Sequence, residues 1–154
     1  MYNETEIAAE LAHIEQNATN VVRDSSGDPI LIETRYSRFK QKLYNTLGNF
    51  LLRDHLPITE FTPEKMVIGN HYHNFCIESL LIFEKPLVVH LFNPTTNYSY
   101  IKQAQPFTRI VIPPKIAHAL CGLPGGTISE QYDYYVPNDE HSFPLIDLKT
   151  GKPF

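Results

Sequence analysis

Short apolar segments separated by turn residues make up most of the chain from Leu56 onward. The chain has 12 prolines, most of them in this part, and several of the segments alternate apolar and polar residues. A period of two over a few residues, bounded by prolines or glycines, is typical of half-buried strands in a β-sandwich or barrel. The pattern predicts strands at Met66–Ile68, Ser79–Phe83, Leu87–Phe92, Tyr98–Ile101, Thr108–Ile112, Ala117–Cys121 and Ile128–Val136.

Residues 3–16 have a helical pattern instead. Apolar residues recur there with helical spacing, at Ile7, Leu11 and Ile14. Asn3 and Glu6 have the spacing of a capping box, which favours a helix that begins at this point. We therefore predict a short helix that packs on the body of the domain or on a partner subunit.

The segment that follows predicts a hairpin and then a less regular region. Residues 21–23 and 30–34 flank the turn sequence SSGDP, which favours two short antiparallel strands. Residues 36–45 have the apolar spacing of a second helix, and a strand is expected after them.

Composition narrows the class of protein. A chain of 154 residues with 42% hydrophobic and 19% charged residues predicts one globular domain, with an extension over about residues 1–55 and a barrel core over about residues 56–154. The formal charge is −4 and no basic patch dominates, which argues against nucleic-acid binding. No apolar run approaches the roughly 20 residues of a membrane helix, and the N-terminus lacks the features of a secretory signal. We therefore expect a cytoplasmic protein that binds no membrane.

Four residues with metal-binding side chains stand out in GNHYHNFCIE and, downstream, in IPPKIAH. His71 and His73 are separated by one residue, Glu78 follows, and His118 ends the second sequence. Three neutral nitrogens and one anionic oxygen suit Fe(II), Mn(II), Ni(II), Zn(II) or Co(II). The sequence therefore predicts a site for a divalent first-row transition metal; the alternative is four unrelated polar side chains on a sheet.

The spacing of these residues constrains the backbone. His71 and His73 point to the same side if they lie on one strand, whereas Glu78 would point to the opposite side. The chain must therefore bulge or turn between Asn74 and Ile77 if Glu78 is to join the histidines. His118 must come from a distant strand that is folded back beside them.

The pattern resembles the two motifs of the cupin superfamily. The first motif, HxH followed by a few residues and Glu, is matched by His71, His73 and Glu78. The second motif has the form Pro-x-Gly-x-x-His and ends here at His118. The resemblance covers about residues 68–136. It implies an all-β fold, the double-stranded β-helix or jelly-roll barrel, with the metal near the barrel axis.

Two basic residues are candidates for substrate binding. Lys115 occupies the glycine position of the second cupin motif, which suggests a turn of different shape and could place an ammonium group at the pocket rim. Arg109 could bind a carboxylate or phosphate, and an ordinary surface ion pair is the alternative. Glu130 and His141 could also lie near the pocket.

The flanking sequence, including the tyrosine-rich DYYVPNDE, is similar to that of cupins of sugar biosynthesis. These are dTDP-4-keto-sugar 3,5-epimerases, 3,4-ketoisomerases and the metal-binding domains of capsule-sugar enzymes. The resemblance implies proton transfer next to a carbonyl group, with His71 as the base only if it holds no metal. Tyr132, Tyr134 or Tyr135 would be the acid, and Tyr135 is also a candidate for substrate binding.

Three functions remain open from the sequence. The first is a metal-dependent epimerase or isomerase acting on a small molecule. The second is an Fe(II)-dependent dioxygenase that binds a chelating substrate, and the third is a non-catalytic ligand-binding protein. The resemblance also implies a homodimer, because cupins often pair through barrel edges and N-terminal segments such as residues 3–16.

Overall fold

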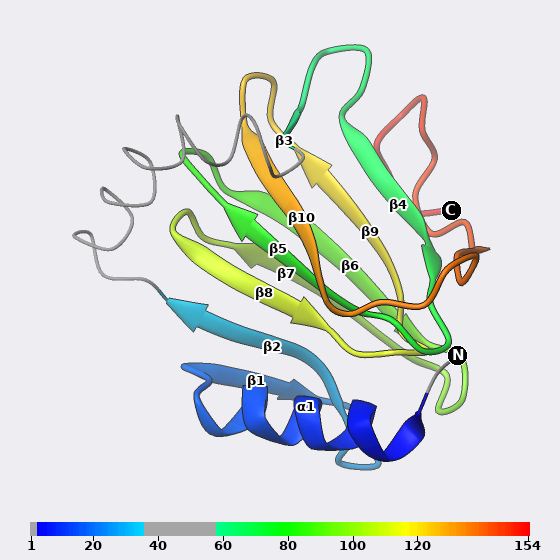
Figure 1. Ribbon diagram of the computed structural model, residues 1–154. Coiled ribbons are helices and arrows are strands. Elements are labelled where there is room, and N and C mark those ends of the chain that lie inside the picture. Colours follow the sequence, from blue (N-terminus) through cyan, green and yellow to red (C-terminus); the bar gives the residue numbers. More distant parts are fainter. Residues whose placement is uncertain (1–2, 36–57) are drawn as a thin grey trace.

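Two antiparallel sheets face each other across an apolar interior (Figure 1). The structure is a computed structural model and describes residues 3–35 and 58–154. The larger sheet has the order β1 (Asn20–Arg23), β2 (Pro29–Arg35), β8 (Thr108–Ile112), β5 (Ile77–Ile82), β10 (Thr127–Tyr134) and β3 (Ile58–Glu60). The smaller sheet has the order β11 (His141–Ser142), β4 (Val67–Tyr72), β9 (Ala117–Gly122), β6 (Leu87–Asn93) and β7 (Tyr98–Ala104).

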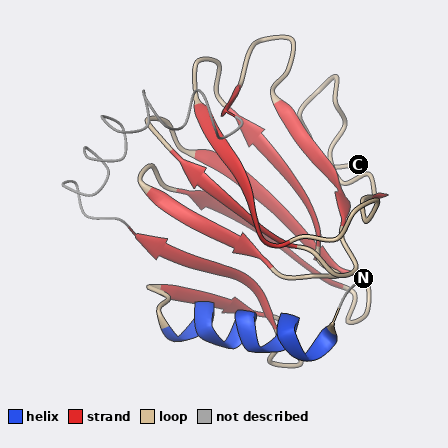
Figure 2. Cartoon of the chain, viewed as in Figure 1, coloured by secondary structure: helices blue, strands red, loops and turns tan. Residues whose placement is uncertain are grey.

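The predicted all-β jelly roll with a short N-terminal helix is confirmed, as are the hairpin of β1 with β2 and the seven predicted strands (Figure 2). Two short strands, β3 and β11, were not predicted because they have only 3 and 2 residues and no alternation to detect. The second helix expected over residues 36–45 lies outside the described residues.

The interior is built from the alternating residues of both sheets. Leu80 on β5 pairs with Ile110 on β8, and Val89 on β6 pairs with Leu120 on β9. Each of these four side chains is buried in one apolar cluster between the sheets. Burial of one such side chain stabilises the fold by about 1.5–3 kcal/mol. We call the sheet surfaces that form this cluster the inner faces and the opposite surfaces the outer faces.

The helix α1 (Glu4–Gln16) packs on the outer face of the larger sheet of its own chain. The side chain of Asn3 accepts hydrogen bonds from the backbone N–H groups of Thr5 and Glu6, as the capping pattern predicted. Ile7 and Ile14 are buried in a second cluster, with β2, β5 and β8. No helix among the described residues has the length and apolar character that a membrane span needs.

Candidate metal centre

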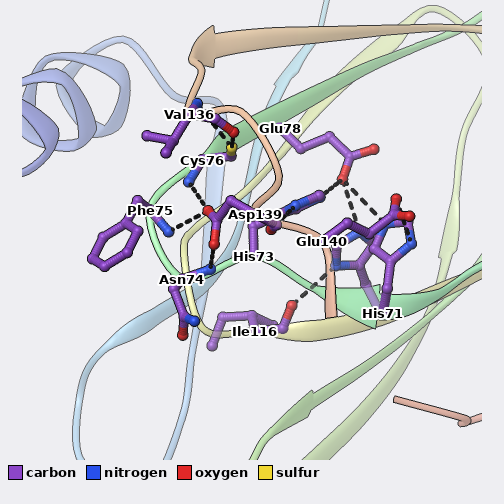
Figure 3. A network of polar contacts seen from close by, with 11 residues as sticks. His71, His73, Asn74, Phe75, Cys76, Glu78, Ile116, Val136, Asp139 and Glu140 are labelled. Carbon is purple, nitrogen blue, oxygen red and sulfur yellow. Dashed lines mark hydrogen bonds and ion pairs between the residues drawn. The ribbon is translucent and has the colours of Figure 1, made fainter. Parts of the chain in front are cut away.

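The four predicted metal-binding side chains meet on the inner faces at one end of the barrel. His71 lies on β4, His73 directly after it, Glu78 on β5 and His118 on β9. One ligand atom from each lies within 4.8 Å of the other three. The Nε2 atoms of His118, His73 and His71 are 2.8, 3.0 and 3.8 Å from Oε2 of Glu78 (Figure 3).

A bulge in β4 aligns His71 with His118. The register of β4 against β9 shifts between Gly69 and His71, so that His71 pairs directly with His118. Gly69 and Asn70 both have positive φ, 99° and 58°, which permits the extra residue. A Cβ atom on Gly69 would lie 2.7 Å from the main-chain oxygen of His118, so only glycine fits the close approach of the two strands.

Glu78 reaches the histidines because the chain changes sheets. β4 belongs to the smaller sheet and ends at Tyr72, whereas β5 belongs to the larger sheet and begins at Ile77. The irregular residues 73–76 connect them, which confirms the turn that the odd spacing of His73 and Glu78 required. The site is therefore built across the interior from both sheets.

Each histidine ring is held at its other nitrogen. Nδ1 of His73 lies 2.8 Å from the main-chain oxygen of Asp139, and Nδ1 of His118 lies 3.0 Å from that of Ile116. Nδ1 of His71 lies 3.1 Å from Oε1 of Glu140. The two main-chain oxygens can only accept, so Nδ1 of His73 and of His118 must carry the proton, and Nε2 of a neutral ring then presents its lone pair to Glu78.

The residues fit a divalent transition metal. Three lone pairs around a carboxylate repel one another unless a cation or proton lies between them, and the buried Nε2 of His71 has no hydrogen-bond partner in the described part of the chain. Two ligands bound at right angles, each about 2.1 Å from an ion, lie about 3.0 Å apart, close to the separations of His73 and His118 from Glu78. Imidazole and carboxylate together are ligands of first-row metals.

Electrostatics keep Glu78 anionic. Burial by itself would raise the pKa of Glu78, but the positive charge that His118 carries when protonated, together with the neighbouring imidazoles of His71 and His73, holds that pKa well below its usual range. Burial works to lower the pKa of His73, and the hydrogen bond and charge of Glu78 outweigh it, so this pKa is raised. The carboxylate is thus available as an anionic ligand at neutral pH.

A second group of potential ligands, His73, Cys76 and Asp139, lies beside the first. Both carboxylate oxygens of Asp139 already accept hydrogen bonds, from the backbone N–H groups of Asn74, Phe75 and Cys76. Sγ of Cys76 lies 3.2 Å from the backbone nitrogen of Val136, which donates to it. The contacts of Asp139 hold residues 74–76 in place, and this structural role accounts for the second group without a metal (Figure 3).

A small hollow of about 190 Å³ opens next to the four-residue site. It is lined by His73, Cys76, Tyr132, Tyr135, Val136, Asn138, Asp139 and Glu140. Tyr132 pairs with Glu78 across β10 and β5 and therefore lies on the inner face, where its ring is 5.7 Å from that of His73. The ring of Tyr135 lies 5.2 Å from that of Tyr132. Both tyrosines thus line the hollow beside His73.

Burial and neighbouring negative charges raise the pKa of two groups near the site. Burial, followed by the charges of Glu78 and Glu130, raises the pKa of Tyr132, so its hydroxyl stays protonated at neutral pH. Burial and the charge of Glu78 also raise the pKa of Glu130. Glu130 pairs with Leu80, which puts its side chain on the inner face, and this side chain has no hydrogen-bond partner among the described residues.

The structure does not bring Tyr134 to the site. Tyr132 and Tyr134 pair with consecutive residues of β5, so Asp133 is an extra residue and the alternation is broken there. Tyr134 consequently joins the outer-face cluster, and its hydroxyl accepts a hydrogen bond of 2.9 Å from the backbone N–H of Asn3. This position disagrees with the expectation that Tyr134 could act as the acid.

Arg109 and Lys115 are also not at the four-residue site. Arg109 alternates with the inner-face Ile110 and lies on the outer face, where it pairs with Asp133 and donates to Ser79. Lys115 is exposed and lines a different hollow, of about 480 Å³, beside α1. Its φ is 69°, so the turn keeps the left-handed conformation of the motif's glycine, contrary to the expected change of shape.

Asp139 and Glu140 were not predicted as parts of the site. They belong to the polar sequence NDEHS, which is typical of a solvated loop. The loop lies close to the histidines because β11, which forms its end, pairs with β4 beside His71. The preceding Pro137-Asn138 turn was the only sequence signal that the chain reverses there.

Comparisons with known proteins show which fold the chain has. No family model matches the chain, and no curated protein matches it. Among solved structures, the dTDP-6-deoxy-D-glucose-3,5-epimerase RmlC from Legionella pneumophila is similar, with a TM-score of 0.52, 16% identity and coverage of 80% of this chain and 76% of that one. The chain has the cupin jelly-roll fold.

Two other cupins are less similar in structure. The 3,4-ketoisomerase QdtA from Thermoanaerobacterium thermosaccharolyticum has a TM-score of 0.48 at 15% identity, over 56% of this chain. The capsular polysaccharide assembling protein CapF from Staphylococcus aureus has a TM-score of 0.47 at 15% identity, over 58% of this chain. The match spans only 63% of the ketoisomerase and 27% of CapF.

Proposed function

We propose that this chain is a metal-binding enzyme of the cupin fold that moves a proton next to the carbonyl group of a small, sugar-like molecule. One observation carries the proposal: three imidazole Nε2 atoms and the carboxylate of Glu78 converge on the inner faces, beside a hollow lined by Tyr132 and Tyr135. The keto-sugar nucleotide bound by the Legionella epimerase makes this substrate class the first to test.

Within this proposal, His71, His73, Glu78 and His118 hold the metal ion. When bound, the ion supplies Lewis acidity toward a carbonyl oxygen, which acidifies the neighbouring C–H bond. The protein itself must then accept and return the proton. Glu130 is the candidate base, because it lies on the inner face without a partner among the described residues and with a raised pKa. The hydroxyl of Tyr132 is the candidate donor.

The dimensions of the hollow support a small substrate. Its volume of about 190 Å³ is below the range of roughly 300–1,000 Å³ that is usual for drug-sized ligands. Tyr132 and Tyr135 offer ring faces to the apolar C–H surface of a sugar, while Asn138 and Glu140 offer polar groups to its hydroxyls. We expect the reacting ring to enter this hollow.

A second candidate is a metal-free epimerase with His71 as the base. It is favoured by the Nε2 atom of His71, which has no hydrogen-bond partner among the residues that the structure describes. The Glu140 carboxylate near Nδ1 also favours it, because it would orient the ring and stabilise its protonated form. The two candidates exclude each other at this residue, because a nitrogen bound to a metal cannot accept a proton.

Elemental analysis separates the two candidates. The protein is purified without a metal-affinity column, reconstituted with Fe(II), Zn(II) or Co(II), and compared with the His118→Ala variant. Near-stoichiometric metal that is lost in the variant supports the metal-dependent enzyme. Absence of metal from both proteins after reconstitution overturns it and leaves the metal-free candidate.

The reaction is tested by exchange of solvent deuterium. Four-keto sugars, free and nucleotide-linked, are incubated with the enzyme in D₂O, and NMR follows the carbon next to the carbonyl. Exchange that needs the bound metal supports the proposal. Oxygen consumption that requires Fe(II), without exchange, would instead support the dioxygenase expected as an alternative. Metal binding with neither activity would favour a non-catalytic ligand-binding protein.

A further inference from the structure

Two neighbouring loop residues, Asp139 and Glu140, contact the outer nitrogens of two of the three histidines. We propose that they are positioning residues, which fix the orientation of His73 and His71 and thereby set the affinity of the site for metal. The inference rests on the metal site of the proposed function and assigns a role to a loop that lies outside the cupin motifs of the sequence.

Asp139 acts as the anchor of the loop. Only 6% of its surface is exposed, and both of its carboxylate oxygens accept backbone hydrogen bonds from Asn74, Phe75 and Cys76, at 3.0, 2.7 and 3.0 Å. These bonds join residues 74–76 to the loop after β10 (Figure 3). The main-chain oxygen of the same residue then accepts from Nδ1 of His73, so one residue fixes both the connection to β5 and the His73 ring.

Glu140 acts on His71 through its side chain. Oε1 of its carboxylate lies 3.1 Å from Nδ1 of His71 as an ion-pair contact, whereas the other two rings contact main-chain oxygens. Of the three rings, that of His71 has the Nε2 farthest from Glu78, at 3.8 Å, and this Nε2 has no hydrogen-bond partner within residues 3–35 and 58–154. The carboxylate of Glu140 is therefore the polar contact that orients this ring.

The two residues differ in burial, and this makes the role of Glu140 testable without damage to the fold. The Glu140 side chain is 64% exposed, so its removal leaves no cavity, and the His71 side chain that loses this contact is itself 18% exposed. Loss of a partner at the outer nitrogen of a metal-bound histidine lowers metal affinity about 10- to 100-fold, because the ring loses its orientation and part of its basicity.

The test is a Co(II) titration of the reconstituted protein, with the affinity measured by competition with a chelator. We expect Glu140→Ala to bind Co(II) about 10- to 100-fold more weakly than the wild type. Glu140→Gln keeps an acceptor oxygen without the charge and should recover part of the loss. Glu84→Ala, which removes an exposed carboxylate from a turn, is the matched control and should leave the affinity unchanged.

The visible spectrum of bound Co(II) gives a second readout, because the absorption bands change when a ligand is displaced. Equal affinity and spectrum in Glu140→Ala and the wild type would overturn the inference, and so would an equal loss in Glu84→Ala. A wild-type protein that binds no Co(II) would overturn both the inference and the metal-dependent function. Weak binding by Glu140→Ala alone supports the inference even if no substrate is found.

Discussion

Tyr132 and Tyr134 differ in their surroundings although only one residue separates them. The extra residue Asp133 turns Tyr132 toward Glu78 and Tyr134 toward the N-terminus of α1. Tyr132→Phe should lower kcat about 10²- to 10⁴-fold with little loss of stability, since it removes a positioned proton donor. Tyr134→Phe should leave kcat within about twofold and lower the free energy of unfolding by about 0.5–1.5 kcal/mol, the usual contribution of a hydrogen bond. Steady-state kinetics and urea unfolding of both variants check this; equal kinetic effects would contradict it.

Lys115 adopts a conformation that suits glycine better. With a φ of 69° the left-handed conformation costs a lysine about 1–2 kcal/mol, whereas glycine adopts it freely and loses roughly 0.5–1 kcal/mol through its more flexible unfolded chain. Lys115→Gly should therefore raise the free energy of unfolding by up to about 1.5 kcal/mol. Lys115→Ala is the control and should not be stabilised. A KM that rises strongly in both variants would instead indicate that Lys115 binds the substrate.

At the scale of a single element, the bulge of β4 decides whether His71 meets His118. Gly69→Ala places a methyl group 2.7 Å from the main-chain oxygen of His118 at a φ of 99°. The backbone strain alone costs about 1–3 kcal/mol, and relief of the clash must separate β4 from β9. We expect a lower melting temperature and weaker Co(II) binding than in wild type. Gly27→Ala, which meets no atom within 4 Å at a φ of 87°, controls for strain without the clash and should keep the affinity.

The hairpin of β1 and β2 is joined to the turn after β6 by Asp24. Burial would raise the pKa of this carboxyl, but hydrogen bonds from Ser26, Asn93 and Asp28 lower it from 3.8 to about 2. Because the pKa is lower in the folded than in the unfolded chain, the stabilisation is fully present above about pH 4 and is lost as the pH falls toward 2. Asp24→Asn should therefore be less stable at neutral pH, and its stability should change less than that of wild type between pH 4 and 2. Thermal unfolding across this range measures the difference.

Prediction from sequence succeeded for features that depend only on the pattern of residues within one segment. Alternation located the strands, and the odd spacing of His73 and Glu78 required the change of direction that the structure has. It failed where the position of a side chain depends on a segment that is distant in the sequence. Alternation does not tell which face of β8 is inside, so the sequence left Arg109 open between substrate binding and an ion pair, and the structure has the ion pair with Asp133. Asp139 and Glu140 were missed because their partners are more than 60 residues away in the chain.

At the scale of the whole molecule, the proposed metal site links the two sheets. His71 and His118 lie on the smaller sheet and Glu78 lies on the larger one, so a bound ion would connect both layers across the interior. Unfolding must then separate its ligands and release it. Metal binding to this site should therefore stabilise the entire fold rather than one loop.

This linkage predicts how thermal stability depends on metal. At a free concentration 100 times Kd, a metal that binds only the folded chain adds about 2.7 kcal/mol, which corresponds to a rise of about 5–10 °C for a domain of this size. A chelator should reverse the rise. His118→Ala should melt at the same temperature with and without Co(II), because loss of a buried ligand removes the site. His13→Ala, which changes an exposed histidine on α1, should respond like wild type. An equal rise in His118→Ala would mean that the ion binds elsewhere, since the ligands from β4 and β5 alone would not hold it as tightly.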